Sequence, residues 1–248
     1  MGLFDFFKKS GSTPPPGNAP SKKVAGPAKL VADKRAQAYD RQEAIRELGA
    51  MKTAEAAEAL LKRFNFSIDP SITDQEEKES AYEAIVDVGK EALEPVRNFC
   101  KRAEILTWPI RILRAVLEDD EYKEELLRLA DEFDIEYARN VEPKLQVVSA
   151  LAEVRGEDVR SAVERFLEDA NETVRFHAVE STFAQSKKDS IPALVALLEQ
   201  EESVRIKNKV CEGFITKSWK VPSELMPTVK QALRDVDFRV DDAGSLAR

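Results

Sequence analysis

Between residues 33 and 236 the apolar residues recur at helical spacing, in stretches that arrive in pairs. Short breaks rich in Gly, Asp, Asn or Pro separate the stretches, and such residues favour the ends of helices. In the first pair, the helix that ends at Gly49 and its partner have apolar faces made of Ala44, Ile45, Leu48, Ala56, Leu60, Leu61 and Phe64. This pattern predicts an all-α chain.

Five further pairs follow, with apolar faces between Ala81 and Cys100, Ile110 and Phe133, Leu145 and Leu167, Val174 and Leu198, and Val204 and Leu233. Comparable positions recur at nearly equal intervals along the chain: Trp108, Val141, Val174 and Val204. A helical pair cannot bury its apolar face alone, so such units stack on their neighbours. We therefore predict a right-handed α-solenoid of about six helical pairs over residues 33–236.

Composition supports helices, because the chain has only 9 Gly and 7% aromatic residues against 34% charged residues. The net charge of −8 argues against nucleic acid as a partner, since phosphate contacts need dense Lys and Arg. The charge is uneven, however. Residues 67–104 and 105–140 each carry five basic and ten acidic side chains, whereas residues 200–234 carry seven basic and four acidic ones.

The two ends of the chain differ from the repeats. Residues 1–9 form a short amphipathic peptide, and residues 10–32 contain so much Pro and Gly, with so little to bury, that we expect a disordered linker. Residues 237–248 follow the last pair and are expected to be a C-terminal tail. No stretch reaches the roughly 18 apolar residues of a membrane span.

Two segments resemble HEAT repeats, of the kind also called PBS-lyase-type repeats: Asp169–Val179 and Glu201–Arg205. In that family a turn acid precedes a Val-Arg pair that opens the first helix, as in Val174-Arg175 and Val204-Arg205 here. The third and fourth pairs depart from the pattern, with Trp108-Pro109 and Val141-Glu142-Pro143 at the corresponding turns. The resemblance covers residues 33–236 and implies an α-solenoid.

Residues with catalytic potential are sparse in the sequence. The one histidine, His177, lies within a predicted helix, and the His-Glu pairs by which HEAT-like deoxyhypusine hydroxylases hold iron do not occur. The chain contains neither a Gly-x-Ser-x-Gly elbow nor a phosphate-binding Gly-rich loop. Cys100 and Cys211 lie on apolar faces and are expected to be small buried hydrophobes. We predict a protein that is not an enzyme, with no cofactor and no metal site.

The repeats also allow other functional interpretations. HEAT-like alkylpurine DNA glycosylases use Trp and Asp in a basic groove, and Trp108 and Trp219 are present here, although no Asp accompanies Trp219. HEAT-like bilin lyases share the same repeats. A peripheral membrane organiser is a further alternative.

Two sets of residues are candidates for binding. In the N-terminal peptide, a helix would gather the aromatic and aliphatic side chains on one face for a membrane surface or a protein groove, with lysines beside them: Leu3, Phe4, Phe6, Phe7, Lys8 and Lys9. In the last repeat, basic side chains surround a tryptophan that could anchor an acidic partner: Arg205, Lys207, Lys209, Lys217, Trp219 and Lys220.

The sequence thus predicts a cytoplasmic, non-catalytic protein-binding scaffold or adaptor. Its expected partners are proteins with an acidic patch or a helical segment. Recruitment through residues 1–9 to the inner face of a membrane is the alternative location.

Overall fold

The computed structural model describes residues 21–186 and 188–248. Helices account for most of these residues and the only sheet among them has two short strands, which confirms the all-α class. Following α1 (Lys22–Ala32), the helices are α2 (Ala38–Met51), α3 (Ala54–Leu61), α4 (Ser71–Val86), α5 (Leu93–Cys100), α6 (Thr107–Val116), α7 (Asp119–Asp131), α8 (Glu142–Leu151), α9 (Glu157–Arg165), α10 (Glu172–Gln185), α11 (Ile191–Gln200), α12 (Val204–Lys217) and α13 (Met226–Ala232). Short 3-10 turns accompany them: η1 (Lys62–Asn65), η2 (Gly89–Ala92), η3 (Phe166–Glu168), η4 (Lys188–Ser190) and η5 (Ser223–Leu225).

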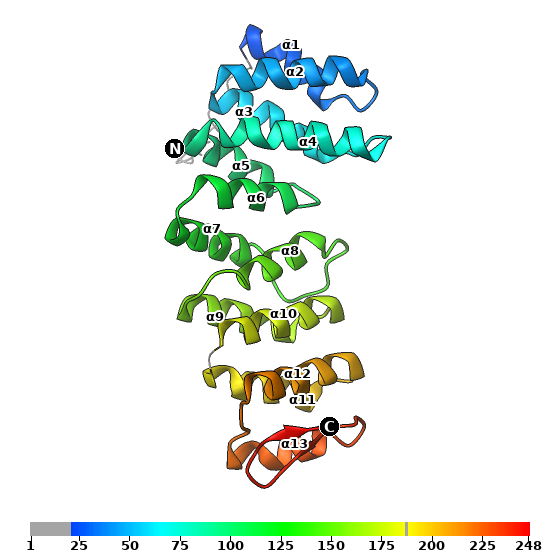
Figure 1. Ribbon diagram of the computed structural model, residues 1–248, viewed down its shortest axis with the longest axis vertical. Helices are drawn as coiled ribbons and strands as arrows, with labels where there is room; N and C mark the ends of the chain where they lie inside the picture. Colours follow the sequence, from blue (N-terminus) through cyan, green and yellow to red (C-terminus); the bar gives the residue numbers. More distant parts are fainter. Residues whose placement is uncertain (1–20, 187) are drawn as a thin grey trace, which may run out of the picture.

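The helices follow one another along the long axis of the molecule, in sequence order (Figure 1). We call α2, α4, α6, α8, α10 and α12 the first helices and α3, α5, α7, α9, α11 and α13 the second helices. Each first helix contacts the next first helix along the chain. Among the second helices, α3 contacts α5, α7 contacts α9 and α11 contacts α13. The expected pairs therefore correspond to consecutive helices of the structure.

Local sequence explains where the helices begin and end. The Asn171 side chain accepts hydrogen bonds from the amides of Thr173 and Val174, and the Ser203 hydroxyl accepts one from Ile206, so both residues act as N-caps. At the other ends, α10 stops at Ser186 and α12 at Ser218, both in the left-handed conformation.

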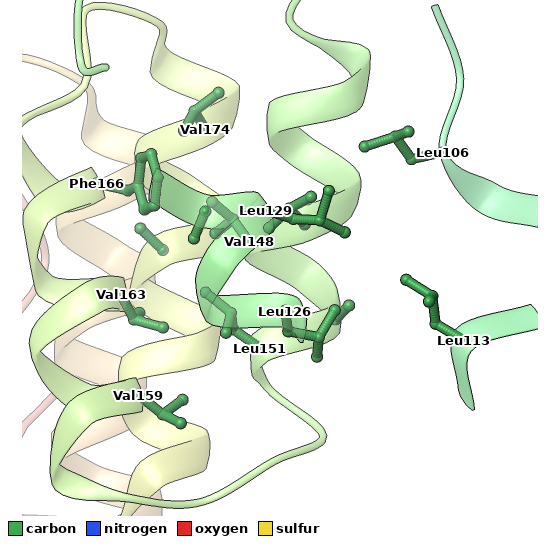
Figure 2. Packing of buried hydrophobic residues seen from close by; sticks show 14 of the residues in the cluster. Leu106, Leu113, Leu126, Leu129, Val148, Leu151, Val159, Val163, Phe166 and Val174 are labelled. Atoms are coloured by element: carbon green, nitrogen blue, oxygen red, sulfur yellow. The ribbon is translucent and has the colours of Figure 1, made fainter. Parts of the chain in front are cut away.

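Side chains from successive helices fill a continuous apolar interior. Figure 2 shows Leu126 and Leu129 of α7 beside Val148 and Leu151 of α8, with Val163 from α9 nearby; all five are buried. Cys100 and Cys211 are part of this interior, and burial raises the pKa of each thiol to about 12. Their expected role as buried hydrophobes is confirmed.

The predicted linker over residues 10–32 is wrong in its last part, because residues 22–32 form α1. Val24, Ala28 and Val31 lie on one face of this helix and are buried against α2 and α3. The apolar side chains outweigh Pro27, which lies inside the helix. Residues 1–20 lie outside the described part of the chain.

The predicted C-terminal tail, residues 237–248, has regular structure of its own. Its residues form an antiparallel pair of short strands, β1 (Arg239–Val240) and β2 (Leu246–Ala247). Phe238 and Leu246 are buried, and the Val221 amide donates to the Gly244 carbonyl at 2.8 Å. The segment therefore folds back over the end of the last pair. Among the described helices, none has the length and apolar character needed to cross a membrane.

Candidate binding surface

The structure separates the six basic-patch residues predicted in the last repeat. Two of them lie in the interior. The Lys207 ammonium donates to both carboxylate oxygens of Asp235 at 2.9 Å and to the Ala232 carbonyl at 3.1 Å. Trp219 is only 5% exposed and packs against Phe183 and Phe214, with ring centroids 5.3 and 6.1 Å away. Neither side chain is available as a surface contact, which corrects their placement in the patch.

Arg205 and Lys209 share one aromatic neighbour. The Arg205 guanidinium lies 3.9 Å from the centre of the Phe176 ring, and the Lys209 ammonium lies 5.1 Å from it. Each base also has an acidic partner, since Arg205 is 4.0 Å from Glu172 and Lys209 is 2.6 Å from Glu180. The positive charge expected here is therefore largely balanced.

The remaining basic residues lie apart from that pair. Lys217 is exposed and donates to the Ser186 hydroxyl at 2.8 Å. Lys220 is also exposed, and its backbone forms an isolated bridge with Ser245. The six residues thus do not form one basic patch. The residues of the amphipathic peptide, Leu3 to Lys9, lie outside the described part of the chain.

Ion pairs with at least one buried side chain define the register of the last three pairs. A base near the start of each first helix meets an acid that follows the second helix: Lys144 with Asp169 at 2.7 Å, Arg175 with Glu201 at 2.8 Å, and Lys207 with Asp235 at 2.9 Å. Arg175 therefore corresponds to Lys207. The sequence register that aligned Val174-Arg175 with Val204-Arg205 is shifted, because Arg205 is not the equivalent of Arg175.

The side-chain burial agrees with this corrected register. Val174 is fully buried, and so is Ile206, which now occupies the corresponding position. Val204, in contrast, is 48% exposed.

Exposed apolar side chains recur in the first turn of the first helices or in the loops just before them. We call this group the edge row: Tyr39, Ile72, Ile105, Tyr137 and Val204, which are between 48% and 82% exposed. The first four follow one another at almost equal intervals in the sequence. The loops that lead into α4, α6 and α8 lie on the right-hand side of Figure 1. The row was not predicted from the sequence, because helical spacing marks the buried face of each helix, although the interval itself is visible there.

Grooves open between the C-terminal ends of neighbouring second helices. The α3–α5 groove, with a volume of about 530 Å³, is lined by residues that include Lys62, Asn65, Phe99, Lys101 and Arg102. The α5–α7 groove is smaller, about 160 Å³. The α9–α11 groove, about 530 Å³, is lined by residues that include Leu167, Glu168, Leu197 and Glu202. We call this end of the pairs, with the edge row, the turn edge.

The turn edge changes its charge along the molecule. The α3–α5 groove has three basic lining residues, Lys62, Lys101 and Arg102, against the single acid Glu58. The α9–α11 groove has the opposite balance, with one base, Arg175, against five acids: Glu164, Glu168, Asp169, Glu201 and Glu202. Two grooves of equal volume therefore offer opposite charges to a partner.

His177 of α10 contacts one hydroxyl and one carboxylate. Its Nδ1 lies 3.2 Å from the Ser149 hydroxyl and 3.4 Å from the Glu180 carboxylate, on a half-buried surface between α8 and α10. Over residues 21–186 and 188–248, no group of three or more His, Cys, Asp or Glu side chains is placed to hold a metal ion.

The geometry of the turn edge suits contact with a large partner, because exposed apolar side chains and grooves lie at the same end of successive pairs. In comparisons with known proteins, no family model matches the chain, and none of the curated proteins is significantly similar to it.

Proposed function

We propose that this chain is a non-catalytic protein-binding scaffold or adaptor, built as a right-handed α-solenoid of HEAT-like pairs and acting in the cytoplasm. The order of contacts supports the solenoid, since each first helix packs on the next one along the chain. The turn acids of the resemblance support the HEAT-like pairs, because Asp169 and Glu201 form buried ion pairs with Lys144 and Arg175.

The observation that carries the binding proposal is the edge row. Five of the large apolar side chains that are exposed in the described residues occur at or just before the start of a first helix. Tyr39 and Tyr137 are 71% and 82% exposed. Tyrosine supplies a large apolar contact and a hydroxyl at low cost in conformational entropy, which is why it is enriched in binding hot spots. A partner that lies along this edge would cover the row and reach the grooves.

The test is capture of partners on the immobilised chain, followed by mass spectrometry, with three versions of the protein. One is the unchanged chain, and one carries the edge substitutions Tyr39→Ser, Ile72→Ser and Tyr137→Ser. The control carries Leu30→Ser and Ile215→Ser, because these two side chains are also exposed, by 40% and 41%, but do not belong to the edge row. We expect partners to be lost only from the edge variant.

Two outcomes would contradict the proposal. If the edge variant keeps every partner of the unchanged chain, or loses no more than the control does, the turn edge is not the binding surface. A reproducible turnover abolished by a single substitution would contradict the scaffold function itself.

The alternatives give different results in the same assays. A DNA glycosylase would need an aromatic face open to a flipped base, but the Trp219 ring packs against Phe183 and Phe214 in the interior. A peripheral membrane organiser would float with liposomes and lose this behaviour when residues 1–9 are deleted. For the bilin lyase alternative, no feature beyond the repeats argues in its favour.

A further inference from the structure

We propose that the α9–α11 groove binds a basic amphipathic segment of a partner protein, in which Lys or Arg residues flank apolar side chains. The inference rests on the proposed scaffold function and names the chemistry of the partner for one part of the turn edge. Both the interior of the groove and its rim support this assignment.

Part of the lining of the groove is apolar. Leu167 from η3 and Leu197 from α11 are nearly buried and line it, while the partly exposed Ile135 and Ala193 also contribute. The wall at Ile135 is fixed to the next pair, because the Ala170 amide donates to the Ile135 carbonyl at 2.8 Å. A volume of about 530 Å³ accommodates apolar side chains of a bound segment.

The charges inside the groove compensate one another. Arg175 donates to both carboxylate oxygens of Glu201, at 2.8 and 3.0 Å, and Asp169 accepts from Lys144 at 2.7 Å. Burial alone would raise the pKa of Glu201, but hydrogen bonds from Arg175 and from the Ser203 amide hold this pKa below its usual range. The Glu201 carboxylate therefore stays ionised and engaged with its own chain, and it does not attract a partner.

The rim, in contrast, presents carboxylates to the solvent. Glu168 and Glu202 are exposed, and neither side chain forms an ion pair within the described residues. Glu164 lies on the same rim but is paired with Arg160 at 2.7 Å. The charge available to a partner is thus negative, whereas the α3–α5 groove of equal volume is lined by Lys62, Lys101 and Arg102. Charge complementarity selects a basic segment for the α9–α11 groove.

The first experiment measures the anisotropy of a fluorescent amphipathic peptide composed of Leu and Lys, titrated with the full chain. A matched peptide has Glu in place of every Lys. The rim variant is Glu168→Lys with Glu202→Lys. Its control is Glu83→Lys with Glu91→Lys, which changes the net charge equally at two exposed carboxylates that do not line the groove. A third variant, Ala196→Trp, fills the groove from an exposed position on α11 and removes no charge.

We expect the Lys peptide to bind the unchanged chain and the Glu peptide not to bind. Reversing two exposed rim charges should weaken binding about tenfold, because two attractive contacts with the Lys peptide become repulsive. Ala196→Trp should weaken binding as well, whereas the Glu83 and Glu91 control should not. Raising the salt concentration should reduce the effect of the rim variant, because the pairs are exposed.

The proposal is overturned if the Lys peptide fails to bind the unchanged chain, if the control weakens binding as much as the rim variant does, or if Ala196→Trp has no effect. The capture experiment separates this failure from that of the scaffold function. If partners still depend on the edge row while the peptide does not bind, the scaffold stands and the groove assignment falls. If peptide binding depends on the groove but no partner depends on the edge row, the groove assignment stands and the scaffold proposal falls.

Discussion

Arg175 of α10 donates from Nε and Nη2 to the two carboxylate oxygens of Glu201, at 2.8 and 3.0 Å. Glu201 directly follows α11, and the same carboxylate accepts hydrogen bonds from the amides of Glu202 and Ser203, which lead into α12. A single side chain therefore joins both helices of the fifth pair to the start of the sixth. Asp169 does the same one pair earlier, with Lys144 and the Asn171 amide.

Removing one partner of this ion pair should destabilise the fold more than removing both. Arg175→Met leaves the Glu201 carboxylate, which is only 7% exposed, without its counter-charge, and we expect a loss of about 3 kcal/mol. The double variant Arg175→Met with Glu201→Gln should recover about 1 kcal/mol or more of that loss. Urea unfolding followed by circular dichroism measures both. Equal stability of the single and double variants would contradict this prediction.

The pKa of Glu201 predicts how its contribution depends on pH. Its folded pKa lies below the 4.5 of an unperturbed glutamate, so the contribution is fully present above pH 4.5 and is lost as the pH falls through the folded value. We expect the melting temperature to fall between pH 6 and pH 3, and the fall should be smaller for Glu201→Gln than for the unchanged chain. Melting curves across this range check the prediction, and an identical slope for both proteins would contradict it.

Two glycine-to-alanine substitutions should have opposite effects. A methyl group at Gly213 in α12 would overlap the Phe183 ring, so we expect Gly213→Ala to destabilise the protein by about 1–3 kcal/mol despite its better helix propensity. At Gly26 in α1 no atom lies within 4 Å of the added carbon, so Gly26→Ala should stabilise by about 0.5–1 kcal/mol. Thermal unfolding of the two variants measures both changes in stability. Destabilisation by both substitutions would mean that α1 is not a helix.

Trp219 should behave as a core residue and not as a surface anchor. Trp219→Ala removes a ring packed against Phe183 and Phe214, and we expect a loss of about 3–5 kcal/mol. The charge-reversed pair Lys217→Glu with Lys220→Glu alters exposed side chains and should leave stability within about 0.5 kcal/mol of the unchanged chain. Differential scanning calorimetry compares them. A Trp219→Ala variant as stable as the parent would place the ring on the surface after all.

The sequence predicted the helical pairs well because burial imposes a clear spacing. Ala44, Ile45 and Leu48 were expected on one face and are buried in α2. The same reasoning failed for α1, where Val24, Ala28 and Val31 have the spacing of a buried face but lie among Pro and Gly residues. Because the Pro and Gly residues indicated a linker, the short apolar face of this helix was not predicted.

The candidate surface was harder to predict because it depends on tertiary contacts between side chains. Val204-Arg205 resembles Val174-Arg175 in sequence, and only the contact of Lys207 with Asp235 reveals the correct register. The same shift explains why Lys207 was assigned to the surface. Nothing in the sequence around Trp219 distinguishes a ring that packs on Phe183 from an exposed one. The grooves are formed by the ends of separate helices, and their shape follows from packing that no local pattern encodes.

The turn carboxylates also affect the mechanical stiffness of the molecule. Asp169 and Glu201 tie the last three pairs together through nearly buried hydrogen bonds. The ion pairs between the second and third helical pairs include Lys90 with Glu121 and Arg97 with Glu125. Their side chains are more exposed, and exposed ion pairs are weaker. We therefore expect the joint between α5 and α7 to be more compliant than the joint between the fifth and sixth pairs, so that a partner spanning both joints bends the molecule at the former.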